Sequence, residues 1–369
     1  MLRKLRDIIF FITLLLATEV SSAVNVAVIA PMGELYATAG KEVISGVRTA
    51  IDEINNNGGL LGEKINLIEV EDQCNDSLSV STAQMMALNN NEEYKISAVI
   101  GPYCLNQFRL VTDTFANAKI FQILPTAVNE TYADNKHSGL VKMVGYKEQQ
   151  AFDFYQYYKD NFGWMRVALI FDNNNKEIAQ SLQKVFMENQ KNENLIIYNF
   201  EDYSFDFDDI AKQAINDKTQ MAFILSDGEN AARMAKELKS EKKKYIIFVN
   251  KYQVMPEFEK IMGSLMDNCY FMGLPSLKNS PEFTETLVKL RLLGIEPEGL
   301  AVYGYSAVNL WGDLVKKANS FKYLDLAKAL KDNTFDSGWG KLMFVNGNPL
   351  NSINYSIYQY NEEEYTQVY

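Results

Sequence analysis

The sequence is poor in histidine and in basic charge, and both shortages exclude classes of function. His137 is the single histidine, so multi-histidine zinc sites are excluded and a histidine-dependent triad would have to use that residue. Lys and Arg number 36 against 47 Asp and Glu, which gives a formal net charge of −11. Binding to duplex nucleic acid needs a basic face that displaces phosphate counterions, so we expect no nucleic-acid partner. The chain also lacks a glycine-rich phosphate loop, His-Glu-x-x-His, Cys-x-x-Cys and Gly-x-Ser-x-Gly, so neither a cofactor nor a resident metal is expected.

Long apolar runs are equally scarce. One stands near the start, from Ile8 to Ala17, and it is about half of the ~20 residues that span a bilayer. Basic residues precede it, and the small residues Ser21 and Ala23 fit a signal-peptidase site. We therefore expect residues 1–23 to be a signal peptide and the exported chain to begin near Val24. No cysteine follows the run to take a lipid.

The remaining composition is that of a globular protein. Apolar residues make up 47 % and charged residues 22 %, with 20 Gly and only 8 Pro, which excludes disorder and collagen. At roughly 150 residues per domain, the chain should hold about two domains. Three cysteines are present, Cys74, Cys104 and Cys269, and in an oxidising compartment two of them are expected to pair. The count by itself leaves open which two.

Short apolar runs alternate with amphipathic stretches, which is typical of a parallel sheet with helices on both faces. The first set of expected strands is Val24–Ala30, Ile65–Glu71, Ser97–Ile100 and Ile120–Leu124, with helices over about 40–56, 77–88 and 106–117. The second set of strands is Val167–Phe171, Leu195–Phe200, Met221–Leu225 and Tyr245–Val249, with helical segments between them. Three further helices are expected over Phe283–Leu293, Gly304–Ala318 and Leu324–Lys331, followed by strands joined by an Asn346-Gly347 turn. Two α/β units in tandem would place a cleft between two lobes.

Two charged segments have more than one interpretation. The acidic segment Asp202–Asp209 could suggest calcium, but it lacks the glycine turn and terminal glutamate of a calcium loop. A solvated helix N-terminus, where acids complement the macrodipole, is the favoured interpretation. The basic block Lys242–Lys244 stands between a helix and a strand, and we expect a solvated loop rather than a binding patch.

Several segments, taken in order, resemble the branched-chain amino acid-binding proteins, which are periplasmic type I solute-binding components of ABC importers. The matching segments are Ile29–Gly33, Gly46–Asn55, Asn57–Lys64, Val70–Cys74, Ala98–Cys104, Ile123–Ala127, Phe205–Ile210 and Gly338–Phe344. Each motif alone is weakly specific, but their order and spacing cover nearly all of the chain after residue 23.

The resemblance implies two doubly wound α/β lobes joined by three crossovers, with a ligand held between them. The crossovers are expected near Val144, near Leu274 and over Trp339–Phe344. Lobe 1 would then comprise residues 24–144 and 275–338, and lobe 2 residues 145–274 and 339–369. The family carries its disulfide where Cys74 and Cys104 stand, which implies that pairing and leaves Cys269 free. A periplasmic location, an ABC permease as partner and a monomeric state are implied as well.

The ligand positions of the family are matched unevenly. The residues that fall at or beside these positions are Tyr36, Leu105, Asn106, Gln107, Ala127, Val128, Tyr146, Lys176, Asp227, Lys251 and Tyr252. The family holds the ligand carboxylate with hydroxyl groups, but those positions are Leu105 and Val128 here. The acidic partner of the ammonium group is replaced by Lys251. We therefore expect weak or absent leucine binding and a preference for a ligand with an acidic or strongly polar group.

The expected function is delivery of a small solute to an ABC permease. The main alternative is an exported ligand sensor or envelope interaction protein on the same scaffold, which the altered ligand positions would suit. An enzyme is the least favoured interpretation, because Asp172 or Asp227 would have to act alone and no spacing pairs them.

Overall fold

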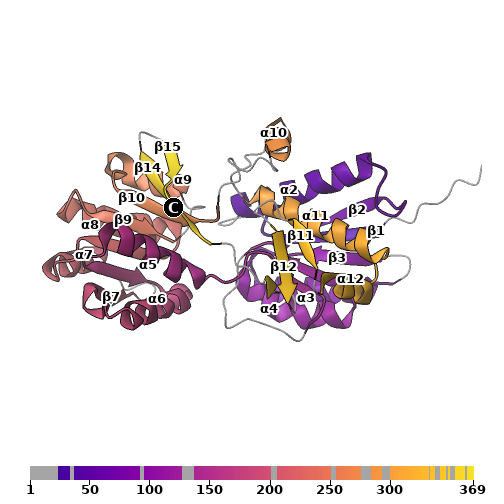
Figure 1. The fold of residues 1–369 in the computed structure, drawn as a ribbon, viewed down its shortest axis with the longest axis horizontal. Coiled ribbons are helices and arrows are strands. Elements are labelled where there is room, and N and C mark those ends of the chain that lie inside the picture. The colour runs from indigo at the N-terminus through magenta and orange to yellow at the C-terminus, as the bar shows by residue number, and fades with distance from the viewer. Residues whose placement is uncertain are drawn as a thin grey trace, which may run out of the picture.

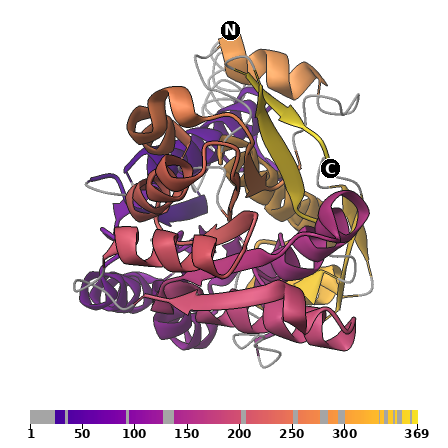
Figure 2. The ribbon, with the colours of Figure 1, turned by 90° about the vertical axis from the view of Figure 1, so that its left-hand side faces the viewer.

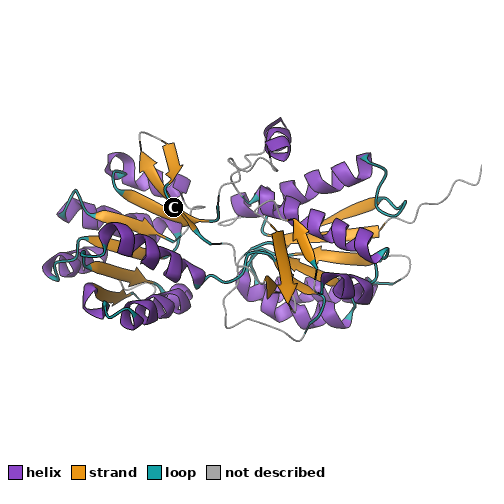
Figure 3. Cartoon of the chain, viewed as in Figure 1, coloured by secondary structure: helices purple, strands orange, loops and turns teal. Residues whose placement is uncertain are grey.

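Two β-sheets enclosed by helices form two lobes that lie side by side (Figure 1). Figure 3 shows the same view by secondary structure, with helices outside the strands in both lobes. The computed structural model describes residues 24–33, 37–91, 95–126, 137–200, 206–250, 255–275, 284–292, 300–331, 333–336, 341–345, 348–349, 354–361 and 364–369. Within these ranges, no helix combines the length and the apolar character needed to cross a membrane.

The first sheet is entirely parallel, with strand order β2-β1-β3-β4-β5. Its strands are β1 Val24–Ala30, β2 Ile65–Glu71, β3 Ile96–Ile100, β4 Phe121–Leu124 and β5 Leu140–Lys142, and helices α2 Ala37–Asn56, α3 Asp76–Asn89 and α4 Leu105–Asn117 connect them. Successive residues of a strand point to opposite faces. In β1, Val26 and Val28 therefore join the core beneath α2, whereas Ala27 and Ile29 pack with α3 and α4.

Three later helices complete the first lobe. They are α10 Thr284–Leu292, α11 Ala301–Ala318 and α12 Tyr323–Leu330. Helix α11 lies against α2, and two glycines allow the backbones to approach closely. A Cβ on Gly46 would lie 1.7 Å from the Ala301 carbonyl oxygen, and one on Gly304 would lie 2.2 Å from that of Val43. Residues far apart in the chain thus share one core around the buried Trp311.

The second sheet has strand order β15-β14-β10-β9-β8-β6-β7. Figure 2 views the molecule with the lobe that contains this sheet toward the viewer. Its strands are β6 Val167–Phe171, β7 Leu195–Asn199, β8 Met221–Leu225, β9 Ile246–Val249, β10 Cys269–Gly273, β14 Ser356–Asn361 and β15 Glu364–Gln367. Helices α5 Gln149–Phe162 and α6 Lys176–Glu188 cover one face, and α7 Phe207–Asn216, α8 Gly228–Glu241 and α9 Met255–Met262 cover the other. Among the described pairings of this sheet, only those of β14 with β10 and with β15 are antiparallel.

The boundary between the lobes near the C-terminus differs from the expectation. Strands β11 Thr334–Asp336, β12 Lys341–Val345 and β13 Asn348–Pro349 form a small antiparallel sheet. Leu342 and Phe344 lie in the core of the first lobe, so β12 packs there and not in lobe 2 as the boundary at residue 339 implies. After β13 the chain returns to the second sheet at β14. It does not do so earlier, because the apolar face of β12 is buried against the first lobe.

The sequence patterns predict most elements to within a few residues, but they miss strands β5, β10 and β11 and helix α9. Strand β5 is only three residues long, which is too short for a periodic pattern. The run Cys269–Gly273, next to the crossover expected near Leu274, was not predicted as a strand, yet it is a fully buried strand. It pairs with β9 on one side and β14 on the other, a long-range contact that no local pattern encodes.

Candidate functional site

The carboxyl edges of both sheets meet at the junction of the lobes. The chain leaves β5 through Val144, which lies in the first core, and enters α5 at Gln149. Leu274 directly follows β10 and packs against the cores of both lobes. The Tyr358 hydroxyl donates a hydrogen bond to the Leu274 carbonyl oxygen at 2.6 Å. Doubly wound sheets bind ligands at this edge, where loops and helix N-termini gather.

Tyrosines and a carboxylate from distant parts of the chain pack at the same junction. Tyr303 of α11 is buried, and burial together with the neighbouring Tyr358 and Tyr355 holds its pKa well above the ordinary value. The backbone N–H of Tyr355 donates to an Asp153 carboxylate oxygen at 2.6 Å. Burial raises the pKa of Asp153. The segment that enters β14 is thereby attached to α5.

A disulfide joins two loops at the carboxyl edge of the first sheet. Cys74 follows β2 and Cys104 follows β3, and the disulfide between them has a Cα–Cα distance of 5.5 Å. Gln107 reinforces it, because its amide nitrogen donates to the Cys74 carbonyl oxygen at 2.7 Å and to Asp76 at 2.6 Å. Gln107 therefore holds the disulfide loop within the first lobe.

Carboxylates fasten the neighbouring loops. Both carboxylate oxygens of Glu71 accept from the N–H of Met32, at 2.9 and 2.8 Å, and one also accepts from the N–H of Gln73 at 2.8 Å. Asp72 accepts from the N–H of Cys74 at 3.1 Å and from the Ser79 hydroxyl at 3.2 Å. Burial raises the pKa of Asp72. The loops after β1 and β2 are thus held by hydrogen bonds internal to the lobe.

A second polar network lies at the carboxyl edge of the second sheet. Asp172, Ser226 and Asn250 each come directly after a strand, β6, β8 and β9, and all three are buried. Asp172 accepts from the Ser226 hydroxyl at 2.8 Å and from the Asn175 side-chain nitrogen at 2.7 Å. The Asn250 side-chain nitrogen donates to the Asn175 side-chain oxygen at 3.1 Å. This network spans three neighbouring strands and holds their loops together.

A family model for periplasmic binding proteins matches residues 23–364, which is most of the 369-residue chain. The chain belongs to the periplasmic binding protein family. The Leu/Ile/Val-binding protein BraC3 of Rhizobium johnstonii is 24 % identical over 341 residues, which cover 91 % of each chain. The leucine-specific-binding protein of Salmonella typhimurium is 23 % identical, with 98 % of each chain covered. The resemblance to branched-chain amino acid-binding proteins is therefore confirmed.

Solved structures show the same fold for this periplasmic binding protein. A leucine-binding protein LivK from Thermotoga maritima has a TM-score of 0.79 at 18 % identity, covering 94 % of this chain and 98 % of that one. An ABC transporter solute-binding protein from R. palustris in complex with benzoate has a TM-score of 0.77 at 15 % identity, covering 94 % and 95 %. Proteins of this fold therefore hold chemically different ligands, and the fold alone does not define the solute.

Two of the predicted ligand residues of this periplasmic binding protein begin helices of the second lobe. Lys176 is exposed at the first position of α6. Asp227 is half-buried and caps α8, because its carboxylate accepts from the backbone N–H of Asn230 at 2.9 Å and from the Asn230 side chain at 2.8 Å. Asp227 and Asp172 therefore both act as structural acceptors in this family member.

The other predicted ligand residues are only partly placed. Tyr146 is half-buried and packs against Phe108, Leu124 and Leu140 of the first lobe. Leu105 and Asn106 form the first turn of α4 at the edge that carries the disulfide, but their side chains are outside the description. The residues that lie outside the described ranges are Tyr36, Ala127, Val128, Lys251 and Tyr252.

The structure describes part of the acidic segment Asp202–Asp209 and all of the basic block Lys242–Lys244. Asp206 caps α7, because its carboxylate accepts from the N–H of Asp208 at 3.0 Å; residues 201–205 lie outside the description. This agrees with the helix N-terminus, and no group of His, Cys, Asp or Glu among the described residues could hold a metal ion. Lys242–Lys244 are exposed between α8 and β9, as predicted.

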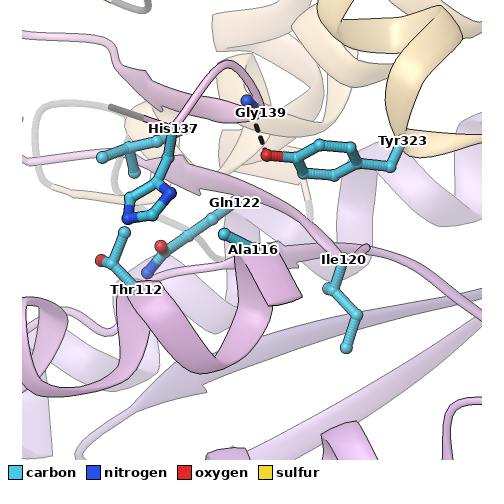
Figure 4. Close-up of a pocket in the computed structure, with 8 residues that line it drawn as sticks. Thr112, Ala116, Ile120, Gln122, His137, Gly139 and Tyr323 are labelled. Atoms are coloured by element: carbon cyan, nitrogen blue, oxygen red, sulfur yellow. Dashed lines mark hydrogen bonds between the residues drawn. The ribbon is translucent and has the colours of Figure 1, made fainter. Parts of the chain in front are cut away.

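A small recess in the first lobe contains the single histidine (Figure 4). Tyr323 of α12 closes one side, and its hydroxyl oxygen accepts from the N–H of Gly139 at 3.1 Å. His137 pairs with Asp113 at 2.6 Å. Ile120 and Gly139 precede β4 and β5, so the recess lies at the amino ends of these strands. It is therefore at the edge opposite the disulfide and away from the candidate ligand site.

The sequence interpretation missed Asn175, Ser226 and Asn250. A signal was present, because β6, β8 and β9 each end in a bulky apolar residue followed at once by Asp172, Ser226 or Asn250. A polar residue directly after an apolar parallel strand lies at the carboxyl edge of the sheet, and neighbouring strands bring several such residues together.

Proposed function

We propose that this protein is the solute-binding component of an ABC importer, and that it carries a small polar solute between its lobes. The observation that carries the proposal is the meeting of two parallel-sheet carboxyl edges at the lobe junction, each with loops held by internal hydrogen bonds. Such loops keep their shape when the lobes move, so they suit a site that is completed by closure. The match over residues 23–364 supports the same role.

The lobes are proposed to close by hinge motion around their connections. A ligand that touches both lobes favours the closed state in proportion to its differential affinity for that state. Packing supports a division in which lobe 1 contains residues 24–144 and the segment through β13, and lobe 2 contains residues 145–274 and the segment from β14. Export to the periplasm after cleavage near Val24, and a monomeric state, belong to this proposal.

The solute is proposed to carry an acidic or strongly polar group rather than to be leucine, isoleucine or valine. Leu105 and Val128 cannot donate side-chain hydrogen bonds to a carboxylate, and Lys251 would repel an ammonium group. A buried charge without a partner costs several kcal/mol, so a plain branched-chain amino acid would be held poorly.

A thermal-shift screen of amino acids, amides and small acids on the chain from residue 24 tests the function. A solute present at about 100 times its Kd stabilises the folded state by about 2.7 kcal/mol, which gives a clear rise in melting temperature. A screen in which no solute raises the melting temperature would refute the proposed function.

Calorimetry with leucine, isoleucine and valine tests the charge argument separately. We expect no micromolar binding to the wild type and a gain of binding in Lys251→Glu. The matched control is Lys243→Glu, which makes the same charge change on an exposed loop lysine. Micromolar binding of any of the three amino acids to the wild type would contradict the argument, and so would an equal gain in both variants.

A further inference from the structure

The polar network of the second sheet has a direction. Asp172 lies at one end and Asn250 at the other, with Asn175 between them. Each link is a side-chain hydrogen bond, 2.7 Å from Asn175 to Asp172 and 3.1 Å from Asn250 to Asn175. All three side chains are buried, at 5 %, 7 % and 3 % exposure for residues 172, 175 and 250. Water therefore has little access to replace these side-chain hydrogen bonds.

The carboxylate at one end determines which way each amide points. An ionised carboxylate only accepts hydrogen bonds, so Asn175 must turn its NH₂ group toward Asp172 and its oxygen away. That oxygen also only accepts, so Asn250 must present its own NH₂ group to it. The atom that remains at the end of the chain is the Asn250 side-chain oxygen, which is an acceptor.

This last acceptor has no hydrogen-bond partner among the described residues, although it is buried. An amide oxygen that is buried without a partner has lost its hydrogen bonds to water and gained none in return, which is unfavourable. Asn250 follows β9 and comes directly before Lys251, at the edge where the ligand is proposed to bind. The protein therefore keeps a fixed acceptor, directed by a buried charge, at the candidate ligand site.

We propose that Asn250 is a specificity-determining residue whose side-chain oxygen accepts a hydrogen bond from an N–H or O–H group of the solute, and that Asp172 is the positioning residue that maintains this polarity. The inference rests on the proposed function. It adds a second requirement: besides the acidic or polar group discussed above, the solute must carry a hydrogen-bond donor. A solute that lacked the donor would leave the buried oxygen unpaired and would bind more weakly.

Matched pairs of compounds test the donor requirement by calorimetry. The probes are L-malate with succinate and L-2-hydroxyglutarate with glutarate, since all four are acidic compounds and the members of each pair differ only in one neutral hydroxyl donor. In the wild type we expect the hydroxyl compound of a binding pair to bind at least tenfold more tightly than its partner. Equal or tighter binding of the compound without the hydroxyl group overturns the inference.

Asp172→Asn tests the positioning role. An amide at residue 172 can donate as well as accept, so the side-chain amides of Asn175 and Asn250 can each point either way. The bias toward an acceptor at Asn250 then disappears. We expect the ratio of affinities within a pair to fall about tenfold or more. The matched control is Asp206→Asn, the same substitution at the cap of α7, where Asn caps a helix as well as Asp does and the ratio should not change. An unchanged ratio in Asp172→Asn overturns the positioning role.

A second variant covers the case in which Asp172→Asn does not fold, which a melting curve would reveal. Asn250→Leu removes the acceptor and keeps a side chain that branches at Cγ, and it should abolish the preference for the hydroxyl compound. Retention of the preference in a folded Asn250→Leu overturns the inference. A screen in which solutes bind but none carries an N–H or O–H donor overturns this inference and leaves the proposed function standing. A screen in which nothing binds overturns both.

Discussion

Removal of the disulfide between Cys74 and Cys104 should destabilise the first lobe by an amount that the loop length sets. In the double variant Cys74→Ser, Cys104→Ser, the unfolded chain regains the freedom of a loop with a sequence separation of 30. The chain-entropy model gives about 3–4 kcal/mol for a loop of this size. The Gln107 hydrogen bond to the Cys74 carbonyl oxygen survives the change, since it involves the backbone of that residue. We therefore expect a loss near 3 kcal/mol.

Urea unfolding followed by tryptophan fluorescence measures this loss. Trp311 is fully buried in the core of the first lobe and reports on the lobe that carries the disulfide. The midpoint should fall while the second lobe, which contains neither cysteine of the pair, keeps its own transition when followed by hydrogen exchange. Hydrogen exchange separates the lobes because each amide reports the opening of its own structural unit.

Reduction of the wild type provides the matched control. Dithiothreitol should lower the wild-type midpoint to that of the double serine variant and should leave the variant unchanged. Thiol counting in denaturant should find one free thiol before reduction, from Cys269, which is free and buried. An equal midpoint for the oxidised wild type and the variant would refute the reasoning, and three free thiols before reduction would refute the pairing itself.

Three further predictions concern single residues. Gly304→Ala should lower the free energy of unfolding by about 1–3 kcal/mol, because its Cβ would lie 2.2 Å from the Val43 carbonyl oxygen of α2. Gly312→Ala on the same helix meets nothing closer than 3.7 Å and should be neutral or stabilising by up to about 1 kcal/mol, so thermal melts that rank the two the other way would contradict the packing. Burial raises the pKa of the Cys269 thiol to about 12, so iodoacetamide at pH 8 should label it in urea and not in the folded protein, as mass spectrometry would show. Burial also raises the pKa of Asp153 above its unfolded value, so the folded state binds that proton more tightly and gains stability as pH falls through the folded pKa. In Asp153→Asn that gain should be missing, and identical pH dependence of the unfolding free energy in the variant and the wild type would count against it.

Local patterns were sufficient for elements whose signals are complete within a short window. The run Val24–Ala30 is uniformly apolar and forms β1, and the apolar spacing between Gly40 and Asn56 predicts most of α2. The pairing of Cys74 with Cys104 followed from resemblance, and the structure confirms it. The strand run Cys269–Gly273 shows the limit, because its role depends on partners in β9 and β14.

For the candidate site, too, the sequence predicted some features and not others. Its expected location at the carboxyl edges followed from the family resemblance, and it agrees with the way parallel strands bring their ends to one edge. The roles of single residues did not follow. The expectation that Gln107 contacts the ligand stays a prediction, and the structure adds that its amide nitrogen donates to Cys74 and Asp76, because α4 turns that side of the helix toward the disulfide loop.

The sequence by itself determined the alternation of strands and helices and the family, because these depend on periodicity and motif order. Only the tertiary structure decided which lobe contains β12, and it did so through the burial of Leu342 and Phe344. It also decided that Asp172, Asn175 and Asn250 form one hydrogen-bonded chain, although 75 residues separate the two asparagines. The physical reason is that hydrogen-bond direction and side-chain burial depend on atoms that folding brings together from distant positions, and no local window contains both partners.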